Sequence, residues 1–342
     1  MKIEPSEWND DRKATDRSAL EILQTLDRGT YVSAAGKTVA IGDAQRASEQ
    51  GTQLFTPEAL ARLVAASVGR PDLEDVRTGA ERAERARASL SAPGVPGVRT
   101  ATTTPGMSGM SGMSGQSRAS GTGALNRGTT IEVVDATTQQ AAATLATADG
   151  GLVLLNFASA VNPGGGFLGG SKAQEEDLCR SSGLYRTLLR QPEYYRFHRA
   201  HRSPLYSDHL IFSPNVPFFK IDGSGAWLDA PFLASVITAP APNLGAIERE
   251  APADRALIEA TFERRWTNVF AVAEATSHRI LLLGAWGCGV FRNEPELVAQ
   301  TAKRALFSAR FSECFERVVF AIPTGSRRSL ANLSAFRRVL GG

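Results

Sequence analysis

Apolar runs of strand length alternate with helical patterns after residue 128, and this alternation limits the folds that the chain can adopt. The apolar runs cover residues 130–134, 151–157, 208–212, 233–239, 279–283 and 317–322. The helical patterns cover residues 137–148, 174–190, 252–275, 294–309 and 326–340. Buried strands that alternate with helices are typical of a three-layer α/β domain with a largely parallel or mixed sheet. In such a domain a ligand is expected at the carboxyl ends of the strands.

The first 127 residues are organised differently. Their patterns predict a helix over 11–27, a strand pair over 30–41, and helices over 57–68 and 72–90. Residues 91–127 are rich in Gly, Ser, Thr and Met and contain the repeat GMSGMSGMSG, a composition that cannot bury enough apolar surface to fold. We therefore predict an N-terminal accessory region over 1–90, a flexible insertion over 91–127 and a catalytic domain over 128–342.

Composition and charge exclude several classes of protein. Of the 342 residues, 42% are hydrophobic and 21% are charged, as in ordinary soluble globular proteins. The net charge of +3 does not require a nucleic-acid or membrane-surface partner. The three cysteines form no C-x-x-C pair, which favours a reducing compartment over a disulfide framework. Because the chain also shows neither a secretory signal nor an apolar run of membrane-spanning length, we expect a cytoplasmic protein.

The strongest chemical pattern lies in residues 156–182, NFASAVNPGGGFLGGSKAQEEDLCRSS. This segment follows an apolar strand, passes through a run of three glycines and reaches an acidic pair at the start of a predicted helix. Consecutive glycines let the backbone approach a ligand closely and turn its N–H groups towards phosphate oxygens. The loop is therefore predicted to bind an anion. Its candidate residues are Gly164, Gly165, Gly166, Gln174, Glu175 and Glu176.

Two familiar glycine motifs fit this loop poorly. A G-x-G-x-x-G match exists, but a dinucleotide-binding unit would continue with a helix, a second strand and an acidic residue, and here the helix is delayed. A P-loop needs Gly directly before Lys and a Ser or Thr after it, whereas Ser171 precedes Lys172 and Ala173 follows it.

A second glycine-rich loop, GAWGCGVF at residues 284–291, follows another apolar run. Asn293 is predicted to cap the next helix, with Pro295 in its first turn. Two such loops that converge on one cleft would hold a diphosphate between backbone amides and a helix N-terminus. For each loop alone, a tight turn is an equally good interpretation. The candidate binding residues here are Gly287, Cys288, Gly289, Val290 and Phe291, the last as an apolar surface beside a sugar or base.

Together these motifs resemble the poly(ADP-ribose) glycohydrolases. The three glycines, seven further residues and then QEE match the GGG-x(6–8)-QEE signature of that family. The surrounding NFASAVNPGGGFLGG, the following RSSGLY and the loop GAWGCGVFRN resemble its microbial branch over about residues 128–325. The resemblance implies a macrodomain-like three-layer α/β/α sandwich with a mixed sheet and an N-terminal helical accessory region. It also implies binding of ADP-ribose and hydrolysis of the ribose–ribose O-glycosidic bond, without a cofactor or a metal.

The resemblance also assigns roles to the acidic pair. Glu175 and Glu176 are adjacent, so on a helix their side chains diverge by about 100° and cannot flank one bond as the carboxylates of ordinary glycosidases do. One carboxylate must then perform both proton transfers, and the family pattern implies Glu176. Glu175 and Gln174 would orient the sugars, and Asn156 is a candidate contact on the adenine side. An acidic first turn that complements the helix dipole is the alternative interpretation.

Three functions remain open. The leading hypothesis is an enzyme that trims poly(ADP-ribose) and thereby reverses ADP-ribosylation, with ADP-ribose as product, poly(ADP-ribose) or ADP-ribosylated proteins as partners and a link to the DNA damage response. The alternatives are a non-catalytic ADP-ribose reader and an enzyme that removes single ADP-ribose groups from proteins. A reader would have no need of the acid pair.

The stretch YYRFHRAHR contains the other residues with possible chemistry. His198 and His201 form H-x-x-H, but a third metal ligand is not evident, and a surface helix is the better interpretation. Arg196, Arg199 and Arg202 are candidates for binding the next unit of the polymer.

Overall fold

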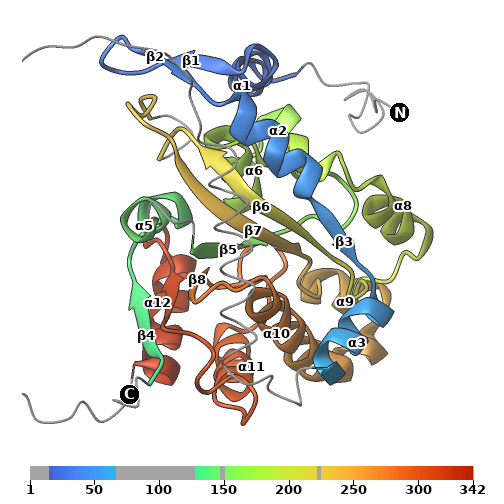
Figure 1. The fold of residues 1–342 in the computed structure, drawn as a ribbon. Helices are drawn as coiled ribbons and strands as arrows, with labels where there is room; N and C mark the ends of the chain where they lie inside the picture. The colour runs from blue at the N-terminus through green and yellow to red at the C-terminus, as the bar shows by residue number, and fades with distance from the viewer. Residues whose placement is uncertain (1–14, 67–127, 147–150, 222–224, 342) are drawn as a thin grey trace, which may run out of the picture. The chain divides into compact units, whose positions relative to one another are not determined.

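The structure is a computed structural model that describes residues 15–66, 128–146, 151–221 and 225–341 (Figure 1). The predicted helix over 72–90 and the predicted insertion over 91–127 lie outside the described residues. Residues 15–66 and 128–341 belong to one compact unit.

A seven-stranded mixed sheet forms the centre of this unit, in the order β3-β6-β7-β5-β8-β9-β4. The five strands from β7 to β4 are parallel, whereas β6 and β3 run antiparallel to their neighbours. The strands are β3 (Gln53–Phe55), β4 (Thr130–Val134), β5 (Leu152–Phe157), β6 (Leu210–Phe218), β7 (Phe232–Ala239), β8 (Ile280–Leu283) and β9 (Arg317–Ala321). The predicted mixed sheet is confirmed.

Helices cover both faces of the sheet, as Figure 1 shows, because the central strands are apolar on both sides. In β8, Leu281 and Leu283 enter one core, whereas Leu282 enters the other. The first core also takes side chains from α3 (Pro57–Ala66), α9 (Leu244–Glu250), α10 (Ile258–Ala275), α11 (Pro295–Leu306) and α12 (Arg327–Leu340). The second takes them from α1 (Arg17–Arg28), α5 (Thr138–Leu145), α6 (Gln174–Ser181), α7 (Leu184–Leu188) and α8 (Pro192–Ala200). This arrangement confirms the predicted three layers.

Two elements differ from their predictions for identifiable reasons. Strand β6 continues past Pro214 and Pro217, where the pattern predicted an end, because a register shift between Ser213 and Val216 accommodates the extra residues. The helix predicted over 174–190 is two helices, because the backbone around Ser182 and Gly183 pairs with the end of β6 instead.

The N-terminal segment contributes both a separate strand pair and an edge of the main sheet. β1 (Thr30–Val32) and β2 (Thr38–Ala40) form the predicted antiparallel pair. The next two elements, α2 (Gly42–Gly51) and β3, were not predicted, since α2 is largely polar and β3 has only three residues. Strand β3 pairs with β6, so this segment completes the sheet on one side. Among the described residues, no helix has both the length and the apolar character needed to cross a membrane.

Candidate active site

A cleft of about 600 Å³ opens at the carboxyl ends of the parallel strands. Its walls include the residues that follow β5, β8 and β9, namely the segments 157–161, 285–287 and 321–323. The first turn of α6, the start of α5, residues of α12, the loop residues 289–291, Tyr206 and Ala241 also line it. The cleft therefore lies where the α/β topology predicts a ligand.

Glu176 lies on the cleft wall and is held by the glycine loop. Its Oε1 accepts a hydrogen bond from the backbone N–H of Gly166, with a nitrogen to oxygen distance of 2.8 Å. The carboxyl group also lies against Gly165, whose φ of +60° is accessible to glycine at little cost. The side chain is largely buried, with 8% of the residue exposed, yet it borders the cleft. This is the position that a proton-transferring carboxyl group requires.

Glu175 also lines the cleft but is more deeply buried than its neighbour, and three groups fix it. Its Oε2 accepts from the backbone N–H of Ser159 at 2.6 Å, and its Oε1 accepts from the Asn156 amide at 3.2 Å. The backbone N–H of Gly164 also interacts with this carboxyl group. Burial, with a smaller contribution from the charge of Glu176, raises the pKa of Glu175 to about 8 despite the opposite effect of these hydrogen bonds.

We expect this raised pKa to make stability depend on pH. The usual pKa of a glutamate is 4.5, so between pH 4.5 and 8 the folded protein holds a proton that the unfolded chain has released. The free energy of unfolding should therefore fall as the pH rises through this range, by up to about 1.4 kcal/mol per pH unit. Urea unfolding of the wild type and Glu175→Gln from pH 5 to 8 should show a flatter dependence in the variant. Equal slopes in the two proteins would contradict this prediction.

The amides of the first glycine loop bind acceptors of the protein itself. The sequence suggested that they face phosphate oxygens, but Gly164 and Gly166 interact with the acidic pair, and the Gly165 N–H donates to the Asn162 carbonyl at 3.0 Å. Of the three glycines, only Gly165 borders the cleft. The physical reason is that helix α6 begins directly behind the loop and places two carboxyl groups against its N–H groups. The loop therefore positions Glu175 and Glu176.

The second glycine loop has amides that are open to a ligand. Within the described residues, the N–H groups of Gly289, Val290 and Phe291 donate to no protein acceptor, and all three residues line the cleft. Gly287 also lines the cleft, with a φ of +72° that favours glycine. Consecutive free N–H groups form a concave site for an anion. This loop therefore offers the diphosphate contacts that the sequence attributed to both loops.

Around this loop, the predicted helix cap at Asn293 is wrong, whereas the predicted position of Pro295 is confirmed. Asn293 does not cap α11, because the N-cap position is Glu294; the Asn293 amide nitrogen instead donates to the carbonyls of Pro242 at 2.7 Å and Gly287 at 3.0 Å and so closes the loop. Pro295 does occupy the first turn. Cys288 is buried and does not border the cleft, and burial raises the pKa of its thiol well above the usual range.

Gln174 and Asn156 use their amides inside the protein. The Gln174 side chain accepts from the Phe157 N–H at 2.9 Å and donates to the Leu155 carbonyl at 2.8 Å, so it ties α6 to β5. Asn156 is fully buried, does not border the cleft, and contacts Glu175 and Thr238. Asn156 therefore supports Glu175 from behind, whereas Gln174 itself lines the cleft and fixes the start of α6 against β5.

Sequence reasoning missed Ser159 and Tyr206. The first holds Glu175 through its N–H, and the second lines the cleft with its ring 6.0 Å from that of Phe291. Neither residue stands in a motif. A serine two residues beyond a buried strand was the only signal for the first.

The two histidines of H-x-x-H, His198 within α8 and His201 directly after its last residue, have different environments. His198 is buried, contacts the Tyr194 carbonyl at 2.8 Å and the Ser207 hydroxyl at 2.8 Å, and burial lowers its pKa to about 4. His201 is exposed and stacks on Phe197. Among the residues that the structure describes, no three His, Cys, Asp or Glu side chains are grouped so that they could hold a metal ion.

Comparison with known proteins identifies relatives over most of the chain. The family described as microbial-type PARG, catalytic domain, matches residues 19–221. The solved poly(ADP-ribose) glycohydrolase of Thermomonospora curvata is 36% identical, with a TM-score of 0.72 over 94% of this chain and 98% of the other. The same enzyme bound to the inhibitor ADP-HPD matches at 36% identity, with a TM-score of 0.71 over 94% of this chain and 97% of the other.

A second bacterial enzyme gives a similar result. The poly(ADP-ribose) glycohydrolase of Deinococcus radiodurans in complex with ADP-ribose is 38% identical, with a TM-score of 0.64 over 87% of this chain and 97% of the other. A search of curated proteins gave no match. The structural matches confirm the predicted macrodomain-like fold. The chain therefore belongs to the microbial-type poly(ADP-ribose) glycohydrolase family, a family of glycoside hydrolases that act on poly(ADP-ribose).

Proposed function

We propose that this enzyme hydrolyses the ribose–ribose O-glycosidic bond of poly(ADP-ribose) with Glu176 as its single acid and base. As an acid, Glu176 donates its proton to the oxygen of the leaving ribose while the glycosidic bond breaks. The sugar carbon that loses this oxygen develops oxocarbenium character. As a base, Glu176 then takes a proton from the water that attacks this carbon, and free ADP-ribose is released.

The observation that carries this proposal is the different use of the two carboxyl groups that line the cleft. Within the described residues, Glu175 accepts hydrogen bonds through both of its oxygens, from Asn156 and Ser159, whereas Glu176 uses only Oε1, on the Gly166 N–H. The two carboxyl groups therefore have different surroundings, which suits different roles. Glu175 serves as a positioning residue that supports the loop before the glycines.

The other wall of the cleft supports a diphosphate and a sugar. The free N–H groups of Gly289, Val290 and Phe291 offer donors to phosphate oxygens, as in other backbone anion sites. The ring of Phe291 gives an apolar surface beside them. The related enzymes bind ADP-ribose or ADP-HPD, and we propose that ADP-ribose occupies this cleft with its diphosphate on the second glycine loop.

The direct test is release of free ADP-ribose from a poly(ADP-ribosyl)ated protein, followed by chromatography. We expect ADP-ribose to accumulate while the polymer shortens. Binding of ADP-ribose without any release would favour a reader. Intact polymer, together with loss of ADP-ribose from singly modified proteins, would favour the mono-ADP-ribosyl hydrolase.

We also propose a cytoplasmic location. All three cysteines are free thiols, which is typical of proteins in a reducing compartment. The link to the DNA damage response stays a prediction.

A further inference from the structure

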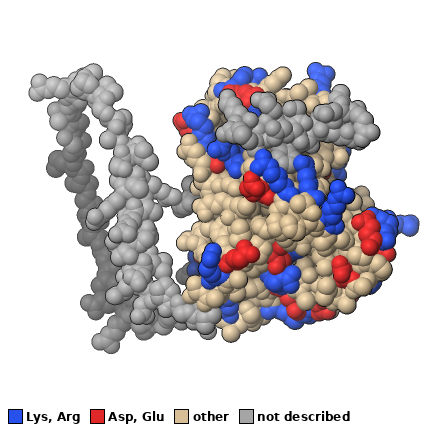
Figure 2. Space-filling model, turned by 90° about the vertical axis from the view of Figure 1, so that its right-hand side faces the viewer, with Lys and Arg blue, Asp and Glu red and all other residues tan. Residues whose placement is uncertain are grey.

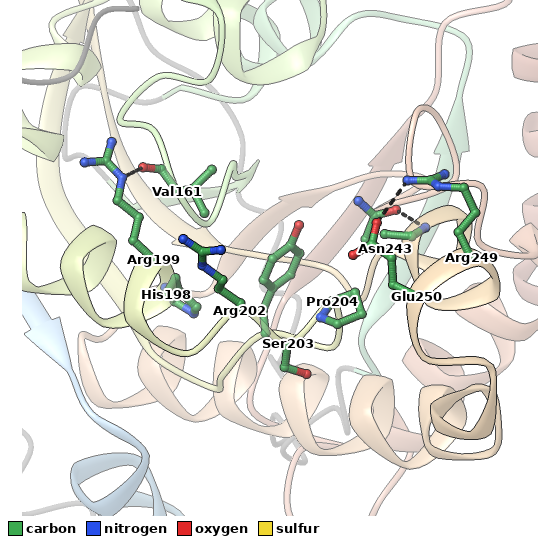
Figure 3. A pocket seen from close by; sticks show the side chains of 11 residues that line it. Val161, His198, Arg199, Arg202, Ser203, Pro204, Asn243, Arg249 and Glu250 are labelled. Carbon is green, nitrogen blue, oxygen red and sulfur yellow. Dashed lines mark hydrogen bonds and ion pairs between the residues drawn. The ribbon is translucent and has the colours of Figure 1, made fainter.

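A second pocket, of about 520 Å³, adjoins the active-site cleft (Figure 3). The two cavities share Val161 and Tyr206 as lining residues, so one wall separates them. Val161 precedes the glycine loop, in which Gly165 contacts Glu176. The second pocket therefore lies beside the segment that leads into the glycine loop.

Three arginines surround this pocket. Figure 3 shows Arg199 and Arg202 on one side of it and Arg249 on the other. The first two come from α8 and the turn after it, and the third comes from α9. Figure 2 views the molecule from the side of α8 and shows Lys and Arg side chains across this face, with Asp and Glu side chains among them.

One acidic residue opposes these charges without cancelling them. Glu250 lines the pocket and contacts Arg249 at 3.4 Å, and both side chains are more than half exposed. An exposed pair of this kind is weak, so a stronger anion can displace it. His198 adds no charge at neutral pH, because its pKa is lowered to about 4. The pocket therefore keeps an excess of positive charge.

The arginines are also held differently from one another. Arg199 donates to the Val161 carbonyl at 2.9 Å and to the Asn162 side chain at 3.0 Å, so it supports the segment before the glycine loop. Arg249 donates to the Gly245 carbonyl through one nitrogen of its guanidinium group. Arg202 makes no ion pair within the described part of the chain. Arg202 and Arg249 are therefore the residues that can turn towards a ligand.

Guanidinium groups on both sides of a pocket are suited to phosphate, which they bind through paired, charge-assisted hydrogen bonds. Every unit of poly(ADP-ribose) carries one diphosphate, so a polymer held in the cleft places another diphosphate beyond the bond to be cut. We propose that this pocket binds the diphosphate of the neighbouring unit through Arg202 and Arg249. The proposal rests on the proposed function, since it requires the polymer as ligand.

The test compares a two-unit oligomer of poly(ADP-ribose) with ADP-ribose, and it uses Glu176→Gln as the parent to prevent turnover. Isothermal titration calorimetry should show that the parent binds the oligomer about tenfold more tightly than ADP-ribose. With Arg202→Ala and Arg249→Ala combined, this gain should fall to about twofold, while the affinity for ADP-ribose stays the same. The control is Arg196→Ala, because Arg196 lies on α8 near the pocket-lining Arg199, pairs with Glu193 and does not line the pocket.

Three outcomes would overturn the proposal. The first is equal affinity of the parent for the oligomer and ADP-ribose, and the second is an unchanged gain in the double variant. The third concerns an oligothymidylate of the same charge as the oligomer. If it binds the parent as tightly as the oligomer does and loses the same affinity in the double variant, the pocket would be a nucleic-acid site.

Chromatography of the oligomer after incubation with the wild type tests the proposed function separately. A lack of cleavage would refute hydrolysis, and the ratio of the two affinities would still decide whether the pocket binds the neighbouring unit.

Discussion

Replacing Glu176 with glutamine should lower kcat on poly(ADP-ribose) by about a thousandfold and leave the Kd for ADP-ribose within about threefold. Glutamine has nearly the same shape, and its amide oxygen can still accept from the Gly166 N–H that fixes the native carboxyl group. It cannot donate a proton to the leaving oxygen or take one from water. Initial rates of ADP-ribose release, with calorimetric titration of ADP-ribose, measure the two quantities separately.

A matched control separates this effect from a general loss of charge. Glu193 lies in the first turn of α8, is exposed and does not line the cleft, so Glu193→Gln should keep the wild-type kcat. If Glu176→Gln retains more than about a tenth of the wild-type kcat, the single-glutamate mechanism is wrong. Loss of ADP-ribose binding in the same variant would instead indicate that Glu176 acts mainly by holding the ligand.

Replacing Gly165 with alanine should lower kcat by about a hundredfold. A Cβ atom at this position would lie 2.5 Å from Glu176 Oε1 and 3.1 Å from Glu175 Oε2, too close for either oxygen to stay in place. The catalytic carboxyl group would have to move, and a displacement of about 1 Å is enough for a loss of this size. The φ of +60° also disfavours alanine, which should reduce the free energy of unfolding by about 1–2 kcal/mol. Initial rates and urea unfolding measure these two effects.

The control for this prediction is Gly169→Ala in the same loop. An added Cβ at Gly169 meets no atom within 4 Å, and its φ is not in the left-handed region, so this variant should retain wild-type kcat and stability. Equal kcat values for Gly165→Ala and Gly169→Ala would refute the claim that the loop positions Glu176.

Much of the fold could be predicted from the sequence because its strands have a simple local pattern. The run 152–155 is apolar without interruption, as a strand that is buried on both faces must be, and it forms most of β5 at the centre of the sheet. Strand β3 could not be predicted in the same way. Its three residues form a strand because the edge of β6 supplies hydrogen-bond partners, and β6 lies more than 150 residues away in the chain.

For the candidate site, the sequence determined which residue types meet the ligand, and the tertiary structure decided what each of them does. The acidic pair and both glycine loops were evident because each chemical group stands in a short local motif. The direction of their N–H groups was not evident, because it depends on which atoms pack against each loop. Helix α6 places carboxyl groups against Gly166, so that loop binds the protein itself, whereas the loop around Val290 faces the cleft. Short motifs fix the chemistry of the groups, but hydrogen-bond partners come from distant parts of the chain, and only folding brings them together.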